Sequence, residues 1–180
     1  MSKLKLATAW LDGCSGCHMS FLDIDERILE LVDLVDLDKS PLNDKKAFDG
    51  PVDIGLIEGA CASEDNVRVL REFREHCRIL VSVGACAVNG GVPAMRNECS
   101  LAECLDAVYV TGPTVDERGA APADEDLPRL LDRVEPCHDV VAIDYTVAGC
   151  PPAGDAIWDG VKALLAGETP RSPFRRMRRD

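Results

Sequence analysis

Apolar residues gather in four short runs along this chain, at 4–11, 52–57, 78–83 and 140–147. Each run is nearly continuous rather than alternating, which is typical of a strand buried on both faces of a parallel sheet. A fifth, weaker run at 33–39 is closed by Ser40-Pro41 and predicts an edge strand. The pattern therefore predicts a sheet of about five strands.

Helical spacing of apolar residues fills the stretches between these runs. We expect helices over 21–32, 64–77 (with Ser63 as N-cap), 101–105 and 153–165. Strands that alternate with helices predict an α/β fold with a doubly wound, mostly parallel sheet in one domain over 1–180. We favour the flavodoxin-like strand order, although sequence alone does not fix it. Residues 119–126 read as a surface loop, and 170–180 as a basic C-terminal tail with five arginines and no core pattern.

Composition narrows the function classes. The chain has 180 residues, 46% of them hydrophobic and 29% charged, as in a globular domain. Its net charge of −12 argues against nucleic acid or an anionic membrane as a partner. No apolar run reaches the roughly 20 residues of a membrane helix, and the start does not read as a secretory signal. We therefore expect a cytoplasmic protein.

Four of the nine cysteines follow three of the predicted core strands. Cys14 and Cys17 follow the first strand, Cys86 follows the third and Cys150 follows the fourth. Because sites in open α/β sheets form at the carboxyl ends of the strands, the four thiols should meet at one edge. Glu58 follows the second strand and should lie at the same edge.

Glycines flank each of these cysteines, namely Gly13, Gly16, Gly84 and Gly149. An iron–sulfur cluster needs close backbone and N–H donors, so the pattern favours such a cluster. Zinc and scattered core thiols remain alternatives, since Cys-x-x-Cys pairs also occur in zinc and thioredoxin-like sites.

Four stretches resemble the small subunit of nickel–iron hydrogenases, in particular the short cytoplasmic type of NAD-reducing hydrogenases. They are Cys14-Ser15-Gly16-Cys17-His18-Met19-Ser20, Asp53-Ile54-Gly55-Leu56-Ile57-Glu58-Gly59, Gly84-Ala85-Cys86-Ala87 with Gly90-Gly91-Val92-Pro93-Ala94, and Gly149-Cys150-Pro151-Pro152. They extend from near the start to Pro152. The related subunit of respiratory NADH:quinone oxidoreductase has adjacent cysteines at its first site, so the Cys14-x-x-Cys17 spacing favours hydrogenase.

The resemblance implies a flavodoxin-like domain in which Cys14, Cys17, Cys86 and Cys150 hold one [4Fe–4S] cluster. No catalytic residue is expected, because hydrogen is split at the nickel–iron site of a large partner subunit. Electrons then pass to diaphorase subunits with flavin and iron–sulfur clusters. A different acceptor (deazaflavin or sulfur), a zinc-binding adaptor without redox activity and a free flavodoxin-like carrier are the alternatives. FMN in this chain is the weaker expectation, because Cys14 and Cys17 use the loop that would hold its phosphate.

Other residues receive secondary roles. Glu58 is a candidate carboxylate beside the cluster or facing the large subunit, with a surface acid that caps a helix as the alternative. His18 could donate to a cluster sulfur, pack at the subunit interface or simply begin a helix. Gly13 and Gly149 are assigned to the surroundings of the cluster. The remaining cysteines are expected to be small buried hydrophobes: Cys61, Cys77, Cys99, Cys104 and Cys137.

Overall fold

The computed structural model describes residues 3–116, 119–171 and 174–177. Its main sheet has six strands in the order β2-β1-β3-β5-β7-β8. The strands are β1 (Leu4–Trp10), β2 (Val35–Leu37), β3 (Val52–Glu58), β5 (Cys77–Val83), β7 (Tyr145–Val147) and β8 (Phe174–Arg176). The pairs among the first five are parallel, and β8 pairs antiparallel with β7. The predicted α/β class and the flavodoxin-like order of the parallel strands are confirmed.

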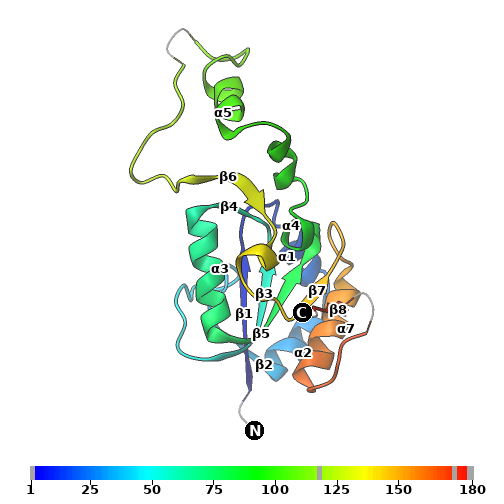
Figure 1. Ribbon diagram of the computed structural model, residues 1–180. Helices are drawn as coiled ribbons and strands as arrows, with labels where there is room; N and C mark the ends of the chain where they lie inside the picture. The colour runs from blue at the N-terminus through cyan, green and yellow to red at the C-terminus, as the bar shows by residue number, and fades with distance from the viewer. Residues whose placement is uncertain (1–2, 117–118, 172–173, 178–180) are drawn as a thin grey trace.

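Helices cover both faces of this sheet (Figure 1). On one face Phe21 of α1, Leu31 of α2 and Trp158 of α7 pack against the strands. On the other face Leu70 and Phe73 of α3 do so. The helix bounds are α1 (Gly16–Leu22), α2 (Arg27–Leu34), α3 (Glu64–His76), α4 (Gly84–Asn89), α5 (Leu101–Tyr109), α6 (Cys137–Val140) and α7 (Gly154–Leu165).

Two helices match their sequence signals closely. Helix α3 begins after Ser63, whose hydroxyl accepts the N–H of Asn66 in a capping box, as the predicted N-cap requires. Helix α7 coincides with the predicted closing helix. Both helices can be predicted from the sequence alone, because a capping residue or an apolar stripe within the helix itself indicates them.

Other elements differ from the prediction. The helix expected over 21–32 is two helices, α1 and α2, with Asp25 between them at a positive φ of 53°. The strand expected over 140–147 is only β7, because residues 137–140 form α6. The expected tail without core pattern is wrong at 174–176, where β8 extends the sheet and Phe174 is buried against Gly160. Arg178 and Arg179 lie outside the described residues.

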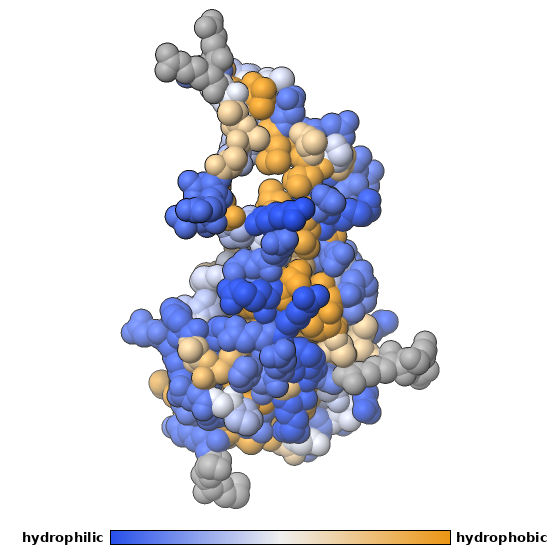
Figure 2. Space-filling model, turned by 60° about the vertical axis from the view of Figure 1, so that its left-hand side comes forward, coloured by the Kyte–Doolittle hydropathy of each residue, from blue (hydrophilic) through white to orange (hydrophobic). Residues whose placement is uncertain are grey.

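A projecting arm was not predicted. Its root is the antiparallel pair β4 (Cys61–Ser63) and β6 (Leu130–Glu135). Beyond that pair lie a 3-10 helix (Pro93–Glu98) and α5, which is longer than the expected 101–105 helix. Residues 110–116 and 119–129 are irregular. We call residues 93–116 and 119–135 the arm. Figure 2 shows it standing out from the body.

Arg96 and Asn97 tie the 3-10 helix of the arm to β6. Arg96 donates to the carbonyl of Leu131 at 2.7 Å, and Asn97 exchanges two hydrogen bonds with the backbone of Val134. Ala60, Ala62 and Val134 form a small apolar cluster against which Cys86 packs. The arm is therefore attached at the edge of the sheet where the cysteines lie.

Candidate metal centre

The carboxyl ends of the parallel strands meet at one edge, and the four predicted cysteines lie there. Cys14 is in the loop after β1, and Cys17 is in the first turn of α1. Cys86 is in α4, directly after β5, and Cys150 follows β7. Three separate connections of the sheet thus bring the four thiols together, as the strand pattern predicted.

Burial and mutual charge set the chemistry of these thiols. Burial raises the pKa of Cys17 to about 12, and the nearby charges of Glu58, Cys86, Cys14 and Cys150 contribute to that rise in that order. Burial also raises the pKa of Cys86, against the opposing effect of a hydrogen bond from the N–H of Val92. Without a cation these two groups would stay protonated at neutral pH. A metal would offset the repulsion and deprotonate them.

Backbone surrounds the sulfurs closely. A Cβ on Gly84, whose φ is +86°, would lie 2.2 Å from the Sγ of Cys17. A Cβ on Gly91, at φ +49°, would lie 2.9 Å from the Sγ of Cys86. Only glycine suits either position, because a side chain would occupy the space of the sulfur and the backbone disfavours it.

Gly13 and Gly149, which were assigned to the surroundings of the cluster, also lie at this edge. The carbonyl of Gly149 accepts the N–H of Ala85 at 2.8 Å and thereby joins the Cys150 loop to α4. Gly13 packs against Gly59, where an added Cβ would lie 3.4 Å from the Gly59 Cα and 3.9 Å from the Sγ of Cys86. Both are part of the cysteine edge.

Among the described residues, no three His, Cys, Asp or Glu side chains converge tightly enough to hold a single metal ion. The four thiols are nevertheless close enough that the charges of neighbouring thiols raise the pKa of Cys17 and of Cys86. In a zinc site all the sulfurs would lie about 2.3 Å from one ion. The donor set of four thiols fits an iron–sulfur cluster, whose irons are held by cysteine thiolates.

Glu58 ends β3 and is buried rather than at the surface. Its carboxylate accepts the N–H of Cys17 at 3.0 Å and the N–H of His18 at 2.9 Å. Burial alone would raise the pKa of Glu58, but hydrogen bonds from the His18 ring and from the amides of Cys17 and His18 hold it below the usual value. The expected surface position of Glu58 is therefore wrong, but its carboxylate does cap a helix, because the two amides lie in the first turn of α1.

His18 is also buried. Its Nδ1 lies 2.5 Å from Oε2 of Glu58, and its Nε2 lies 3.0 Å from Oγ1 of Thr8. Both ring nitrogens thus have oxygen partners, so the ring is not placed to donate to a cysteine sulfur. Thr8 gave no signal in the sequence, because a threonine inside an apolar strand reads as an ordinary strand residue.

The five remaining cysteines divide. Cys61, Cys77 and Cys137 are fully or almost fully buried, as expected, and the thiol of Cys137 donates to the carbonyl of Gly59 at 3.5 Å. Cys99 is exposed and Cys104 is half-buried, both in the arm, so the expectation of a core position is wrong for Cys99. The expectation rested on the usual burial of free cysteine, whereas the arm stands apart from the core.

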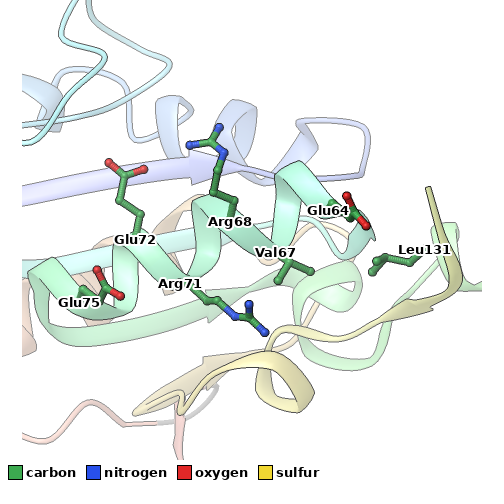
Figure 3. Close-up of a pocket in the computed structure, with 7 residues that line it drawn as sticks. All are labelled: Glu64, Val67, Arg68, Arg71, Glu72, Glu75 and Leu131. Carbon is green, nitrogen blue, oxygen red and sulfur yellow. The ribbon is translucent and has the colours of Figure 1, made fainter. Parts of the chain in front are cut away.

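A different pocket lies along α3. Figure 3 shows it lined by Val67 and five charged residues of α3, with Leu131 from β6. Acids and arginines share this face of the helix, and no cysteine lines the pocket. Its chemistry differs from that of the cysteine edge.

A model of the family described as the 20-kDa subunit of NADH:ubiquinone oxidoreductase matches residues 14–164. The chain belongs to this family. The match begins at Cys14 and includes Cys17, Cys86 and Cys150.

Members of the family that resemble this chain include hydrogenase subunits. The delta subunit of the NAD-reducing hydrogenase HoxS of Cupriavidus necator is 48% identical over 167 residues, which cover 92% of this chain and 80% of that one. An F420-non-reducing hydrogenase chain of Methanothermobacter thermautotrophicus is 40% identical over 92% of this chain, but the match spans only 54% of that protein's length.

A solved structure agrees with these relatives. A chain in the crystal structure of an NAD⁺-reducing [NiFe]-hydrogenase in the H₂-reduced state superposes with a TM-score of 0.92 and 46% identity, over 99% of this chain and all of that one. The predicted resemblance is confirmed: this family member is homologous to the small subunit of NAD-reducing hydrogenase. Within its described residues, no helix is both long and apolar enough to cross a bilayer.

Proposed function

We propose that this chain is the electron-transfer small subunit of a cytoplasmic NAD-reducing nickel–iron hydrogenase. Its partners would be a large subunit with the nickel–iron site and diaphorase subunits with flavin and iron–sulfur clusters. The observation that carries the proposal is the meeting of Cys14, Cys17, Cys86 and Cys150 at one sheet edge in a chain 48% identical to the HoxS delta subunit.

The four cysteines would hold one [4Fe–4S] cluster, which when bound supplies one-electron redox chemistry between the partner subunits. The protein's own residues prepare this place. Gly84 and Gly91 leave room beside the sulfurs, and Glu58 fixes the backbone at Cys17. No catalytic residue of the hydrogen reaction is assigned to this chain.

Exposed apolar side chains near the site support a partner there. Trp10 ends β1, and Met19 lies on α1 two residues after Cys17. Val92 and Met95 follow α4, the helix that contains Cys86, and all four side chains are exposed in the single chain. A cover over these residues would exclude water from the cluster. The large subunit is the cover that the proposed assembly provides.

The test is anaerobic purification of the tagged chain together with its neighbours. We expect a brown complex whose iron exceeds its acid-labile sulfide only by the iron of the nickel–iron site, with about four of each contributed by this chain. Hydrogen-dependent reduction of NAD⁺ should accompany it. Colourless protein with one zinc would contradict the cluster.

Acceptor assays separate the remaining alternatives. Reduction of coenzyme F420 or sulfur instead of NAD⁺ would retain the hydrogenase subunit but change the acceptor. Bound yellow flavin without iron in this chain would favour a flavodoxin-like carrier.

A further inference from the structure

A chain of buried polar side chains leads from the cysteine edge through the sheet to the loop after β2. Its members are Glu58, His18, Thr8 and Ser40, and none is more than 4% exposed. They come from β3, α1, β1 and the loop after β2. Because buried polar groups cost free energy unless paired, four in contiguous contact require an explanation.

Hydrogen bonds join each member to the next. Oε2 of Glu58 lies 2.5 Å from Nδ1 of His18, whose Nε2 lies 3.0 Å from Oγ1 of Thr8. Oγ1 of Thr8 lies 2.7 Å from Oγ of Ser40, which accepts the N–H of Leu42 at 3.1 Å. The chain thus ends on a backbone donor and has a partner at every step.

With a neutral imidazole these bonds can run in one direction only. The ionised carboxylate of Glu58 accepts, so Nδ1 of His18 must donate to it. The bare Nε2 must then accept from the hydroxyl of Thr8, and Thr8 must accept from the hydroxyl of Ser40. Each group therefore fixes the rotamer or tautomer of the next.

At the other end, Glu58 holds the backbone of a proposed ligand. Its two oxygens accept the amides of Cys17 and His18. These amides lie in the first turn of α1, so the orientation of the carboxylate fixes the backbone of Cys17 in that turn.

We propose that Thr8 and Ser40 are positioning residues for the cluster ligand Cys17, acting through His18 and Glu58. This inference rests on the proposed function, because it takes Cys17 as a ligand. The hydrogen bonds connect Thr8 and Ser40 to Cys17 through His18 and Glu58, and through them both residues should influence the electronic state of the cluster. A purely structural role would leave that state unchanged.

The experiment compares Thr8→Val with Thr8→Ser in the purified hydrogenase complex. Valine keeps the size of the side chain and removes the hydroxyl, whereas serine keeps the hydroxyl. We expect Thr8→Val to retain iron and sulfide but to alter the electron paramagnetic resonance spectrum of the reduced cluster. The equilibrium constant for reduction of the cluster should change about tenfold, which corresponds to a shift of about 59 mV in the midpoint potential for one electron. Thr8→Ser should match the unmodified complex.

Two more variants complete the design. Ser40→Ala should shift the potential in the same direction as Thr8→Val, and it decides the matter if Thr8→Val does not assemble. Thr146→Val makes the same substitution at another buried threonine, in β7, and should leave the spectrum unchanged.

The outcomes separate this inference from the proposed function. If the unmodified complex has no iron–sulfur signal in this chain, the proposed function fails. If the unmodified complex has the signal, and Thr8→Val and Ser40→Ala both reproduce its spectrum and potential, only the positioning role is overturned. An equal shift in Thr8→Val and Thr146→Val would also overturn it.

Discussion

Gly84 and Cys17 are packed so closely that a single added carbon on Gly84 would lie 2.2 Å from the Cys17 sulfur. The two residues belong to different connections of the sheet, after β5 and at the start of α1. Their contact therefore shows that backbone from two connections of the sheet packs closely around the sulfur of a proposed ligand.

Gly84→Ala should abolish cluster incorporation. The new Cβ would displace the Cys17 sulfur, and the φ of +86° adds strain of about 1–2 kcal/mol. Iron and sulfide analysis after anaerobic purification measures the effect. Gly167→Ala is the matched control, because Gly167 also has a positive φ (+74°) but would meet no atom within 4 Å. Gly167→Ala should destabilise slightly and retain iron; equal iron contents in the two variants would contradict the close-packing argument.

Replacing Cys14, Cys17, Cys86 or Cys150 by Ser should abolish or convert the cluster, because the hydroxyl is a poor substitute for a thiolate ligand. Absorption spectroscopy and iron content provide the measurement. Cys99→Ser should have no effect, since Cys99 is exposed in the arm. Loss of iron in Cys99→Ser to the same extent would show that the ligand set is wrong.

The stability of the folded chain should fall between pH 9 and 12 in a way that depends on Cys77. Burial raises the pKa of Cys77 from 9.0 to about 12, opposed by Arg74 and assisted by Asp38. In that window the unfolded state loses the proton first, so the free energy of unfolding decreases as pH rises, by up to about 1.4 kcal/mol per unit.

Urea unfolding of the chain at about pH 8 and about pH 10, on either side of the ordinary thiol pKa, tests this. Cys77→Ala should show a shallower decrease than the unmodified chain, besides a constant loss from the missing sulfur. Parallel curves for the two proteins would mean that Cys77 does not ionise differently in the folded and unfolded states.

Asn97→Ala should loosen the arm without emptying the site. Asn97 donates to the carbonyl of Val134 at 2.9 Å and accepts the Val134 N–H at 2.8 Å. Losing both bonds should cost about 1–3 kcal/mol locally and speed hydrogen exchange over 130–135, with iron content retained.

Asn43→Ala is the control for the arm experiment. Asn43 makes a similar pair of backbone contacts, with the carbonyl of Asp38 and the N–H of Lys45. Asn43→Ala should speed hydrogen exchange only near Asp38 and Lys45 and leave residues 130–135 unchanged. Unchanged exchange over 130–135 in Asn97→Ala would show that other contacts hold the arm.

Much of the fold follows from local sequence signals. The apolar runs at 52–57 and 78–83 became β3 and β5, and Ser63 caps α3 as predicted. The placement of Cys14, Cys86 and Cys150 after strands already indicated a common edge, because parallel strands share the direction in which they end. Such signals are local, so no distant contact was needed to recognise them.

Other elements depended on contacts between distant residues. The pairing of β4 with β6 joins Cys61 to Glu135 and Ser63 to Leu130, far apart along the chain, and neither strand has an apolar run of its own. The strand β8 exists because Phe174 finds a place beside Gly160 and β7. An arginine-rich sequence does not reveal such a partner.

By itself the sequence determined the α/β class, the four cysteines and the edge at which they should meet. Only the tertiary structure decided that Glu58 and His18 are buried and paired, and that Thr8 and Ser40 continue the chain of hydrogen bonds. The physical reason is that the end of a strand is determined by residues adjacent in the sequence. The burial and pairing of these four side chains depend instead on contacts between β1, β3, α1 and the loop after β2, which only the folded chain brings together.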